Sequence, residues 1–440
     1  MSQLLKLGEN IYTDSFNTAI KIEEFIGDGG QGEVYRALFN NQQIAVKWYY
    51  PHYLKSDPGL RERLEMLINE GPPTDRFLWP MEFVSSSGIN AFGYLMPFRE
   101  SRFKSLNAMM SGRVKPNSFA IATAGFELSH SYSQLHAKGL CYKDINFGNI
   151  FLDPDSGEIR VCDNDNVDVN GAKGGVGGTQ GFMAPEVERS EAAPTTQTDL
   201  HSLSVLLFYM FMMHHPLCGK REMDIHIFDP VAKRKLYGLE PLFIFDPHDT
   251  SNAPVPGEQI NPLALWPIYP QFLRDLFTKA FTKGLQNPNM RVSEHEWKKS
   301  MVRLRDSIMY CGNCGRENFY DAHSIKQSGG KVGYCWGCYQ ELKFPPRIRI
   351  DGEIIMLNHN TTLFPHHIDH QKQFDFSQPV AAINQNPNDG RWGIKNLGIE
   401  KWSATFPDGH IIDVENGKTV PIPKGIKINF GNTEGEIRLD

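Results

Sequence analysis

The sequence predicts an α+β chain with a small β-rich region, a larger helical region, a cysteine-rich segment and a final all-β region. Three observations support this order. Strand-like alternation runs through residues 18–50, helical spacing dominates residues 117–310, and short apolar runs separated by turn motifs follow residue 346. With 440 residues the chain is too long for one ordinary core, so two to four domains are expected.

The expected elements can be placed in order. Strands are expected at 19–30, 32–39, 42–50, 77–84 and 91–98, with a helix at 58–71 closed by Gly71. Further helices are expected at 117–139, 199–214, 268–284 and 293–310. The most apolar run, Leu203–Met213, has eleven residues and cannot span a ~30 Å hydrocarbon layer, so it predicts a buried helix.

Composition excludes several classes of function. The chain has a net charge of −6 and a pI near 6.2, which favours neither nucleic acid nor an anionic membrane as its main partner. The N-terminal residues lack a basic region followed by an apolar one, so no secretory signal is expected. Three of the seven cysteines stand alone in apolar surroundings, which favours reduced thiols in a cytoplasm.

The stretch "IGDGGQGEV" carries Gly27, Gly29, Gly32 and Val34 in the spacing G-x-G-x-x-G-x-V. Glycines let a backbone pass close to phosphate groups with its amides free to donate. Because the stretch lies between two strands, it favours a loop folded over ATP rather than a dinucleotide-binding turn, which leads into a helix. A flexible hairpin is the alternative.

Lys47 follows thirteen residues after Val34, at the end of the strand "IAVK". A lysine half-buried on a strand needs an anionic partner, which phosphate oxygens and a helix carboxylate would supply. Glu65 is the favoured carboxylate in the helix 58–71, and Glu62, one turn earlier, is the alternative. A surface lysine on an edge strand is the other interpretation.

The stretch "YKDINFGN" places Asp144 and Asn149 five residues apart, and Asp163 follows fourteen residues later. With the glycine loop and Lys47, this set resembles eukaryotic-type protein kinases in their bacterial, Hanks-type form. The resemblance implies a bilobal kinase domain over residues 1–305, with a β-rich N-lobe at about 18–98 and a helical C-lobe at about 99–305. It implies a Ser/Thr protein kinase that uses ATP and Mg²⁺ or Mn²⁺ on protein substrates.

The resemblance also assigns roles. Asp144 corresponds to the catalytic base, Asn149 and Asp163 to the metal ligands, and Thr179 in "GTQGFMAPE" to the threonine that contacts the base. Asp199 is expected to steady the catalytic loop, and Glu186 to pair with Arg291. The nucleotide site would comprise the glycine loop (Gly27, Gly29, Gly32, Val34), Ala45, Lys47, the gatekeeper Met96, and Pro97 and Phe98 of the hinge.

Four positions depart from the kinase pattern. Tyr142 and Lys143 replace the His-Arg before the base, Asn146 replaces the loop lysine, and Asp165 replaces the glycine of D-F-G. Losing the lysine removes a charge from the transferring phosphoryl group, and Asp165 is a candidate further metal ligand. A nucleotide-binding pseudokinase scaffold is therefore the alternative. A small-molecule kinase is less favoured, because "APE" is present.

The activation segment between Asp163 and Thr179 contains no Ser, Thr or Tyr. The residue in the position that would clamp a phosphate is Lys143, which lacks the bidentate fork of arginine. We therefore expect that phosphorylation of this segment does not switch the enzyme.

Cys311, Cys314, Cys335 and Cys338 follow the spacing C-x2-C-x20-C-x2-C. Two such pairs predict a four-cysteine zinc ribbon, over residues 306–345, with a closed structural Zn²⁺ site. A redox-active CxxC pair is the alternative, but that chemistry does not need two copies.

The tail, residues 346–440, contains "IKNL", "GKTVPI" and "GIKINFG" and resembles forkhead-associated β-sandwiches. Their phosphothreonine-binding Gly-Arg and Ser-x-x-His motifs are missing, and Asn396 is the best match to their asparagine, so a scaffolding surface is favoured over phosphopeptide binding. The order of kinase, ribbon and sandwich resembles the bacterial kinases of tellurite-resistance-linked triads. This resemblance implies two partners, a von Willebrand factor A-domain protein and a PP2C-type phosphatase.

Overall fold

The computed structural model describes residues 3–172, 177–386 and 390–439. They divide into two compact units, Met1–Trp266 with Asp275–Met301, and Pro267–Arg274 with Val302–Asp440. The second unit holds both the cysteine-rich segment and the final β region, so a boundary between these two near residue 345 stays a prediction. No helix within the described residues has both the length and the apolar character that a membrane crossing needs.

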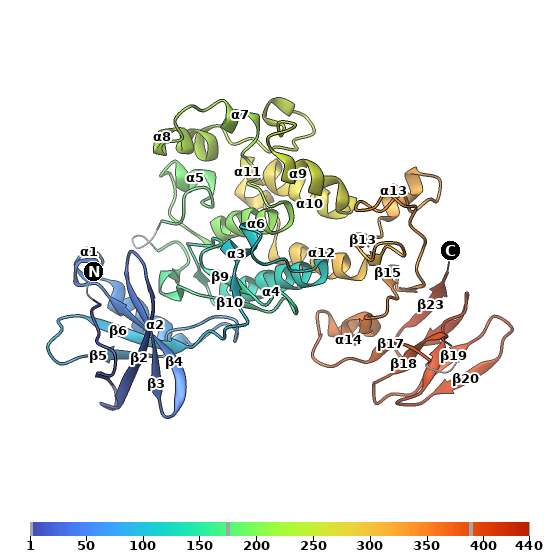
Figure 1. The fold of residues 1–440 in the computed structure, drawn as a ribbon, viewed down its shortest axis with the longest axis horizontal. Helices are drawn as coiled ribbons and strands as arrows, with labels where there is room; N and C mark the ends of the chain where they lie inside the picture. The colour runs from blue at the N-terminus through green and yellow to red at the C-terminus, as the bar shows by residue number, and fades with distance from the viewer. Residues whose placement is uncertain (1–2, 173–176, 387–389, 440) are drawn as a thin grey trace. The chain divides into compact units, whose positions relative to one another are not determined.

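The first unit begins with a closed antiparallel barrel in the order β1-β2-β3-β4-β6-β5, coloured blue in Figure 1. The sequence-based N-lobe, starting near residue 18, was too short, because β1 precedes it and pairs with both β2 and β5. Four residues with two buried side chains are too weak a pattern to predict a strand. The strands are β1 (Asn10–Thr13), β2 (Ala19–Asp28), β3 (Gly32–Phe39), β4 (Gln42–Tyr49), β5 (Glu82–Ser85) and β6 (Phe92–Pro97).

Strand β4 is buried on both faces from Ile44 to Tyr49. Ile44, Val46 and Trp48 belong to the barrel core. Ala45 and Tyr49 belong to a second cluster that includes Leu60 and Leu64 of α2 (Leu60–Glu70). Because side chains alternate along a strand, Lys47 lies on the face of Ala45 and Tyr49.

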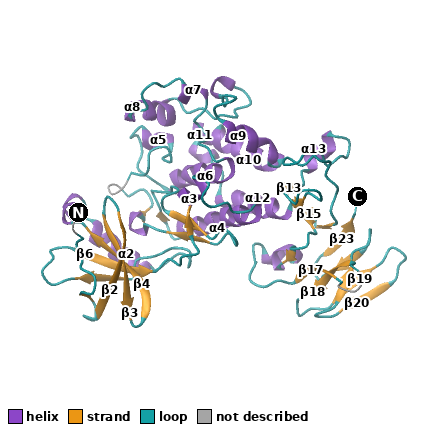
Figure 2. Cartoon of the chain, viewed as in Figure 1, coloured by secondary structure: helices purple, strands orange, loops and turns teal. Residues whose placement is uncertain are grey.

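The rest of the first unit is mostly helical, as the purple segments of Figure 2 show. The predicted helix at 117–139 is confirmed as α4 (Ser118–Ala137), whose N-terminal amide at Ala120 is capped by the Asn117 side chain. The predicted apolar helix is confirmed within α6 (Thr196–Met212), which is buried on nearly every face. The other helices are α1 (Pro51–Ser56), α3 (Leu106–Met110), α5 (Pro185–Glu188), α7 (Lys220–Met223), α8 (Pro230–Arg234), α9 (Ile260–Leu265) and α11 (Lys283–Gln286). Helices α10 (Gln271–Phe281) and α12 (Glu294–Asp306) each contain residues of both units.

Short strand pairs shape the loops of this helical part. The strands are β7 (Lys104–Ser105), β8 (Leu140–Cys141), β9 (Ile150–Leu152), β10 (Ile159–Val161) and β11 (Asp168–Val169). Strand β9 pairs with β7 and β10, and β8 pairs with β11.

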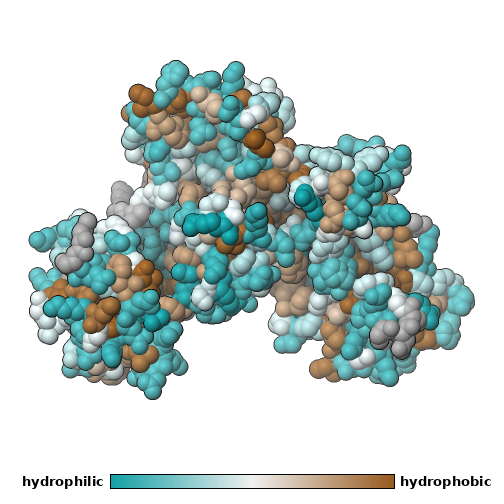
Figure 3. All heavy atoms as spheres, viewed as in Figure 1, coloured by the Kyte–Doolittle hydropathy of each residue, from teal (hydrophilic) through white to brown (hydrophobic). Residues whose placement is uncertain are grey.

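Apolar side chains are exposed near α7 and α8, among them Ile227 and Val231, where brown atoms gather in Figure 3.

The second unit starts with a hairpin of β12 (Ile308–Tyr310) and β13 (Glu317–Phe319), followed by α13 (Ala322–Gln327). Two antiparallel sheets follow, in the orders β15-β14-β23-β22-β19-β20 and β16-β17-β18-β21, with α14 (Pro365–Ile368) after β16. The strands are β14 (Arg347–Ile350), β15 (Glu353–Met356), β16 (Thr362–Leu363), β17 (Ala381–Gln385), β18 (Trp392–Asn396), β19 (Trp402–Thr405), β20 (Ile411–Val414), β21 (Thr419–Pro421), β22 (Lys427–Asn429) and β23 (Glu434–Arg438).

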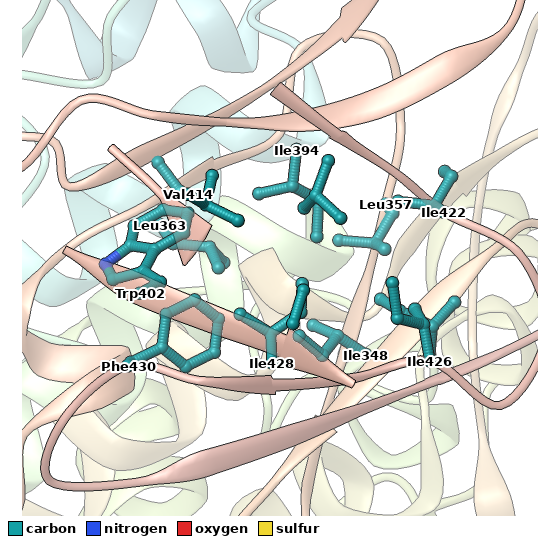
Figure 4. Packing of buried hydrophobic residues seen from close by; sticks show 14 of the residues in the cluster. Ile348, Leu357, Leu363, Ile394, Trp402, Val414, Ile422, Ile426, Ile428 and Phe430 are labelled. Atoms are coloured by element: carbon teal, nitrogen blue, oxygen red, sulfur yellow. The ribbon is translucent and has the colours of Figure 1, made fainter. Parts of the chain in front are cut away.

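Residues from both sheets form one hydrophobic core, in which the rings of Trp402 and Phe430 meet edge to face with their centroids 5.0 Å apart (Figure 4). Met356 of β15 instead packs with Cys311 and Cys335, so the cysteine-rich segment shares a small core with the sandwich edge. The predicted sandwich is therefore present as two packed sheets.

Candidate active site and metal centre

The glycine-rich loop between β2 and β3 borders a cavity of about 850 Å³, a size common for cofactor sites. A Cβ at Gly32 would collide with the carbonyl of Trp48, so the close approach of β3 to β4 requires glycine there. A Cβ at Gly27 or Gly29 would meet nothing within 4 Å, and both residues line the cavity. The loop therefore leaves room beside its backbone for a ligand.

Every residue predicted to bind nucleotide lines this cavity. They are Gly27, Gly29, Gly32, Val34, Ala45, Lys47, Met96, Pro97 and Phe98. Asp163 and Cys162 contribute from the C-lobe side. Burial raises the pKa of the Cys162 thiol to about 12, so this cysteine is a neutral wall residue rather than a nucleophile.

Lys47 is only 4% exposed, as expected for a functional lysine on this strand. Its ammonium donates to both carboxylate oxygens of Asp165, at 2.8 and 3.0 Å, and lies 3.4 Å from Asp163. Burial by itself would lower the pKa of Lys47, but the charges of Asp165 and Asp163 outweigh it and raise the pKa. Lys47 is therefore a buried cation held by the loop that carries Asp163.

The expected pair between Lys47 and Glu65 is wrong in this structure. Helix α2 turns Leu60, Leu64 and Leu67 inward, and at 100° per residue Glu62 and Glu65 fall on the opposite, exposed face. The apolar spacing that identified the helix thus already excluded both carboxylates from the lysine. Choosing Glu65 by its distance from the next strand ignored this facing.

Asp165 departs from its expected role as a metal ligand. It is 2% exposed in the 3-10 turn η1 (Asn164–Asn166) and accepts hydrogen bonds from Lys47 and, at 2.6 Å, from the hydroxyl of Tyr49. The side chain of Asp163, by contrast, is 45% exposed and borders the cavity. The structure therefore separates the two carboxylates, one facing the lysine and the other the cavity.

Asp144 lies between two neutral donors on the C-lobe side. Thr179 donates its hydroxyl to Oδ1 at 2.6 Å, and the Asn149 amide donates to Oδ2 at 3.2 Å. Asn146 also donates to Thr179, at 3.0 Å, and accepts from the amide of Gly148. The predicted contact between Thr179 and Asp144 is thus present, and Asn146 supports the loop without adding charge.

Asp199 holds the backbone of the loop that carries Asp144. Its carboxylate accepts from the amides of Tyr142 and Lys143, at 2.6 and 3.1 Å, as expected. His136 lies between Asp199 and Glu294. Burial would lower the pKa of His136, but hydrogen bonds to these two carboxylates prevail and raise it to about 9, so the imidazolium is a permanent cation at neutral pH.

Glu186 and Arg291 form the predicted pair at 2.8 Å, with the Arg291 side chain 2% exposed. Arg291 also donates to the carbonyl of Gln197. Burial raises the pKa of Glu186, but the guanidinium outweighs it and the net pKa is lowered. This pair ties the segment after Thr179 to the helical core.

The side chain of Lys143 does not face open solvent. Its ammonium pairs with Asp168 at 2.7 Å, and Asp168 also accepts from the amide of Val169 in β11. Strand β11 in turn pairs with β8, directly before the catalytic loop. The carboxylate of Asp168 therefore already occupies the position in which another anion would pair with Lys143. Residues 173–176 of this segment lie outside the described part.

Three participants were missed by sequence reasoning: Gln31, Tyr49 and Asp168. Gln31 of the glycine loop accepts from Lys47 at 2.5 Å and donates to Asn166 at 3.1 Å. Tyr49 could have been found, because strand alternation puts it on the face of Lys47. Nothing in the motif spacing points to Gln31 or Asp168.

The four cysteines form the second candidate centre. The sulfur atoms of Cys311, Cys314, Cys335 and Cys338 all lie within 4.8 Å of one another. Tetrahedral zinc with bonds of about 2.3 Å requires sulfur separations near 3.8 Å, and two of the pairs lie at 3.6 Å. The amides of Gly337 and Asn318 donate to Cys335, as the outer shell of a thiolate site does. The four cysteines therefore fit a closed metal site with four thiolate ligands.

Comparison with known proteins finds one matching domain family and several relatives. Residues 94–311 match the protein kinase domain. A probable serine/threonine-protein kinase gdt4 of Dictyostelium discoideum is 25% identical over 222 residues, 46% of this chain and 13% of that protein. The DNA damage-responsive serine/threonine-protein kinase RqkA of Deinococcus radiodurans is 25% identical over 233 residues, 47% of this chain and 32% of that protein.

A third relative, the serine/threonine-protein kinase pakH of Dictyostelium discoideum, is 24% identical over 196 residues, 43% of this chain and 36% of that protein. The chain thus spans only 13% to 36% of the length of these three relatives. Together with the geometry around Asp144 and the match over residues 94–311, the similarity leads to one conclusion. The chain contains a protein kinase domain.

Proposed function

We propose that the chain is a Ser/Thr protein kinase that uses Mg²⁺ and ATP. The observation that carries the proposal is the position of Asp144, held between Thr179 and Asn149 on the C-lobe side, while the glycine loop and Lys47 line the nucleotide-sized cavity. A carboxylate that accepts a hydrogen bond on each oxygen is fixed in its orientation, which a base for a hydroxyl group needs.

In the proposed reaction Asp144 accepts the proton of a substrate Ser or Thr hydroxyl. The hydroxyl oxygen bonds to the γ-phosphorus of ATP, and the bond from that phosphorus to the β-γ bridging oxygen breaks, leaving ADP. Lys47 and the loop amides hold the phosphates. Asn149 donates its amide nitrogen to Asp144, so its amide oxygen, with the exposed carboxylate of Asp163, would hold Mg²⁺. The metal supplies charge neutralisation for the transferred group.

The test is to incubate the purified chain with Mg²⁺ and γ-labelled ATP beside Asp163→Ala, and to locate label by mass spectrometry. We expect label on Ser or Thr that is absent from the variant. ATP binding with no transfer, even with candidate partners added, would instead support a pseudokinase scaffold, the alternative that Asn146 in place of the loop lysine favours. A small-molecule kinase is disfavoured by the Glu186–Arg291 pair, because this pair anchors the "APE" segment that resembles the one in protein kinases.

We further propose that this kinase does not depend on phosphorylation of its activation segment. The Lys143–Asp168 pair supports this, because a carboxylate already neutralises the residue that a phosphate would engage. Phosphatase treatment should leave kcat nearly unchanged, whereas Asp168→Asn should lower it, because the buried ammonium of Lys143 loses its carboxylate partner. Loss of activity on dephosphorylation, restored by rephosphorylating Thr179, would contradict this.

The second unit is proposed to be a zinc ribbon joined to a forkhead-associated-like interaction module. Asn396, the best match to the asparagine of that family, is fully buried and donates to the carbonyls of Glu400 and Val414, which is a loop-holding role. The partners proposed from the resemblance are a von Willebrand factor A-domain protein and a PP2C-type phosphatase, in the cytoplasm. Co-purification of the three proteins, compared with a chain cut before residue 306, tests this.

A further inference from the structure

Lys47 needs a carboxylate, and the structure offers one from an element other than the helix. We propose that Asp165 is the positioning residue of Lys47, so that the lysine is aligned by the metal-binding loop and not by helix α2. This deepens the proposed kinase function and rests on it. Asp165 would act on the nucleotide through Lys47, not by touching the reacting atoms.

The contacts of Asp165 carry the inference. Both of its oxygens lie within 3.0 Å of the lysine nitrogen, and one also accepts from Tyr49 at 2.6 Å. Lys47 and Tyr49 stand two residues apart on one face of β4, so a single carboxylate bridges two rigidly spaced donors. The two donors of β4 therefore fix the position of the Asp165 carboxylate.

The turn that presents Asp165 is itself fixed. The neighbouring Asn164 is fully buried and donates its amide to the carbonyl of Val161 at 3.0 Å. Asn166 accepts from Gln31 of the glycine loop, which also contacts Lys47. The lysine, the glycine loop and the metal-binding turn therefore form one connected polar network.

Helix α2 presents leucines, and neither Glu62 nor Glu65, to the lysine face of β4. Leu60 and Leu64 pack with Ala45, Tyr49 and Tyr94, in the cluster on the lysine face of β4. A helix carboxylate could reach Lys47 only if the helix rotated and exposed these leucines to water, which their burial opposes.

The position of Asp163 indicates what the loss of Asp165 would do. Asp163 is the other carboxylate near Lys47, at 3.4 Å, and it is the proposed metal ligand. Without Asp165, the buried ammonium would turn to Asp163 and away from the phosphates, because a buried charge requires a counter-charge. Asp165 therefore keeps the lysine and the metal from competing for one carboxylate.

The test is a double-mutant cycle on the full chain, with Asp165→Asn, Lys47→Met and the double variant. The dissociation constant of a fluorescent ATP analogue is measured with Mg²⁺ and with EDTA, and kcat is measured with labelled ATP. We expect Asp165→Asn to weaken nucleotide binding roughly tenfold, about the effect of one charge-assisted hydrogen bond, and to lower kcat at saturating ATP. In the Lys47→Met background the same change should alter the dissociation constant less than about twofold.

Two results would overturn the inference. One is a loss of affinity in Asp165→Asn that persists in the Lys47→Met background and needs Mg²⁺, which would make Asp165 a metal ligand. The other comes from Glu62→Gln combined with Glu65→Gln, whose exposed sites should not disturb folding: a tenfold fall in kcat would restore the helix carboxylate. Nucleotide binding without any transfer by the wild type would defeat the proposed kinase activity, yet the binding cycle would still test Asp165.

Discussion

The two sides of the nucleotide cleft follow the sequence motifs to different degrees. On the C-lobe side, Asp144 contacts Thr179 and Asn149 as the motifs imply. On the N-lobe side, Lys47 lies where the motif puts it, but its partner is Asp165 and not a helix glutamate. The motifs specify the partners of Asp144 even where these lie on a separate segment, whereas the partner of Lys47 depends on which face of α2 is buried.

The largest effect should come from the C-lobe side. Asp144→Asn keeps the shape of the side chain but removes the base and one of its two acceptor oxygens, so kcat should fall about 10²- to 10⁴-fold with nucleotide affinity little changed. Steady-state kinetics and nucleotide titration of the same preparation would measure both. Retention of more than about a tenth of the activity would mean that the loop does not carry the chemistry.

The next effect concerns the Glu186–Arg291 pair, which ties the segment after Thr179 to the helical core. Arg291→Met leaves Glu186 with an uncompensated, partly buried charge and should lower the free energy of unfolding by about 3–5 kcal/mol. Urea unfolding followed by tryptophan fluorescence measures it, with exposed Arg113→Met as the control. A loss no larger than that of the control would place the anchor elsewhere.

A smaller effect is expected in the glycine loop, where two glycines make a matched comparison. Gly32→Ala forces a Cβ against the Trp48 carbonyl and should cost about 2–3 kcal/mol of stability, the range of overpacked sites. Gly29→Ala has open space and should leave the melting temperature nearly unchanged while raising the KM for ATP. Equal melting temperatures for the two variants would contradict the close approach of β3 to β4.

The last effect concerns pH and is confined to alkaline solution. The folded pKa of His136, about 9, lies above its ordinary value of 6.5, so its stabilisation is fully present below about pH 6.5 and is lost as pH rises through 9. The loss should be about 3 kcal/mol between pH 6.5 and 9.5. Unfolding curves of wild type and His136→Gln should converge at the alkaline end; a constant gap would show that His136 is not charged.

Much of the fold could be predicted because local patterns specify it. The helical spacing at 117–139 and the apolar run at 203–213 placed α4 and α6, and the paired CxxC motifs placed a four-sulfur cluster. Strand β1 could not be predicted, because four residues gain their strand conformation only by pairing with both β2 and β5.

The sequence also predicted which residues line the candidate site, but not the carboxylate partners of Lys47 and Lys143. The nine residues expected around the nucleotide all line one cavity, because glycine spacing and strand alternation determine their facing. Asp165 and Asp168 were not assigned their partners, since each bonds a lysine from another part of the chain. Such pairings require knowledge of the tertiary packing.

The most direct measurement is a crystal structure of the full chain with ADP and Mg²⁺. We predict the Lys47 ammonium within hydrogen-bond distance of Asp165, with Asp163 on the metal and Glu65 in solvent. A lysine bonded to Glu62 or Glu65, with Asp165 turned to the metal, would contradict the difference between the two sides of the cleft.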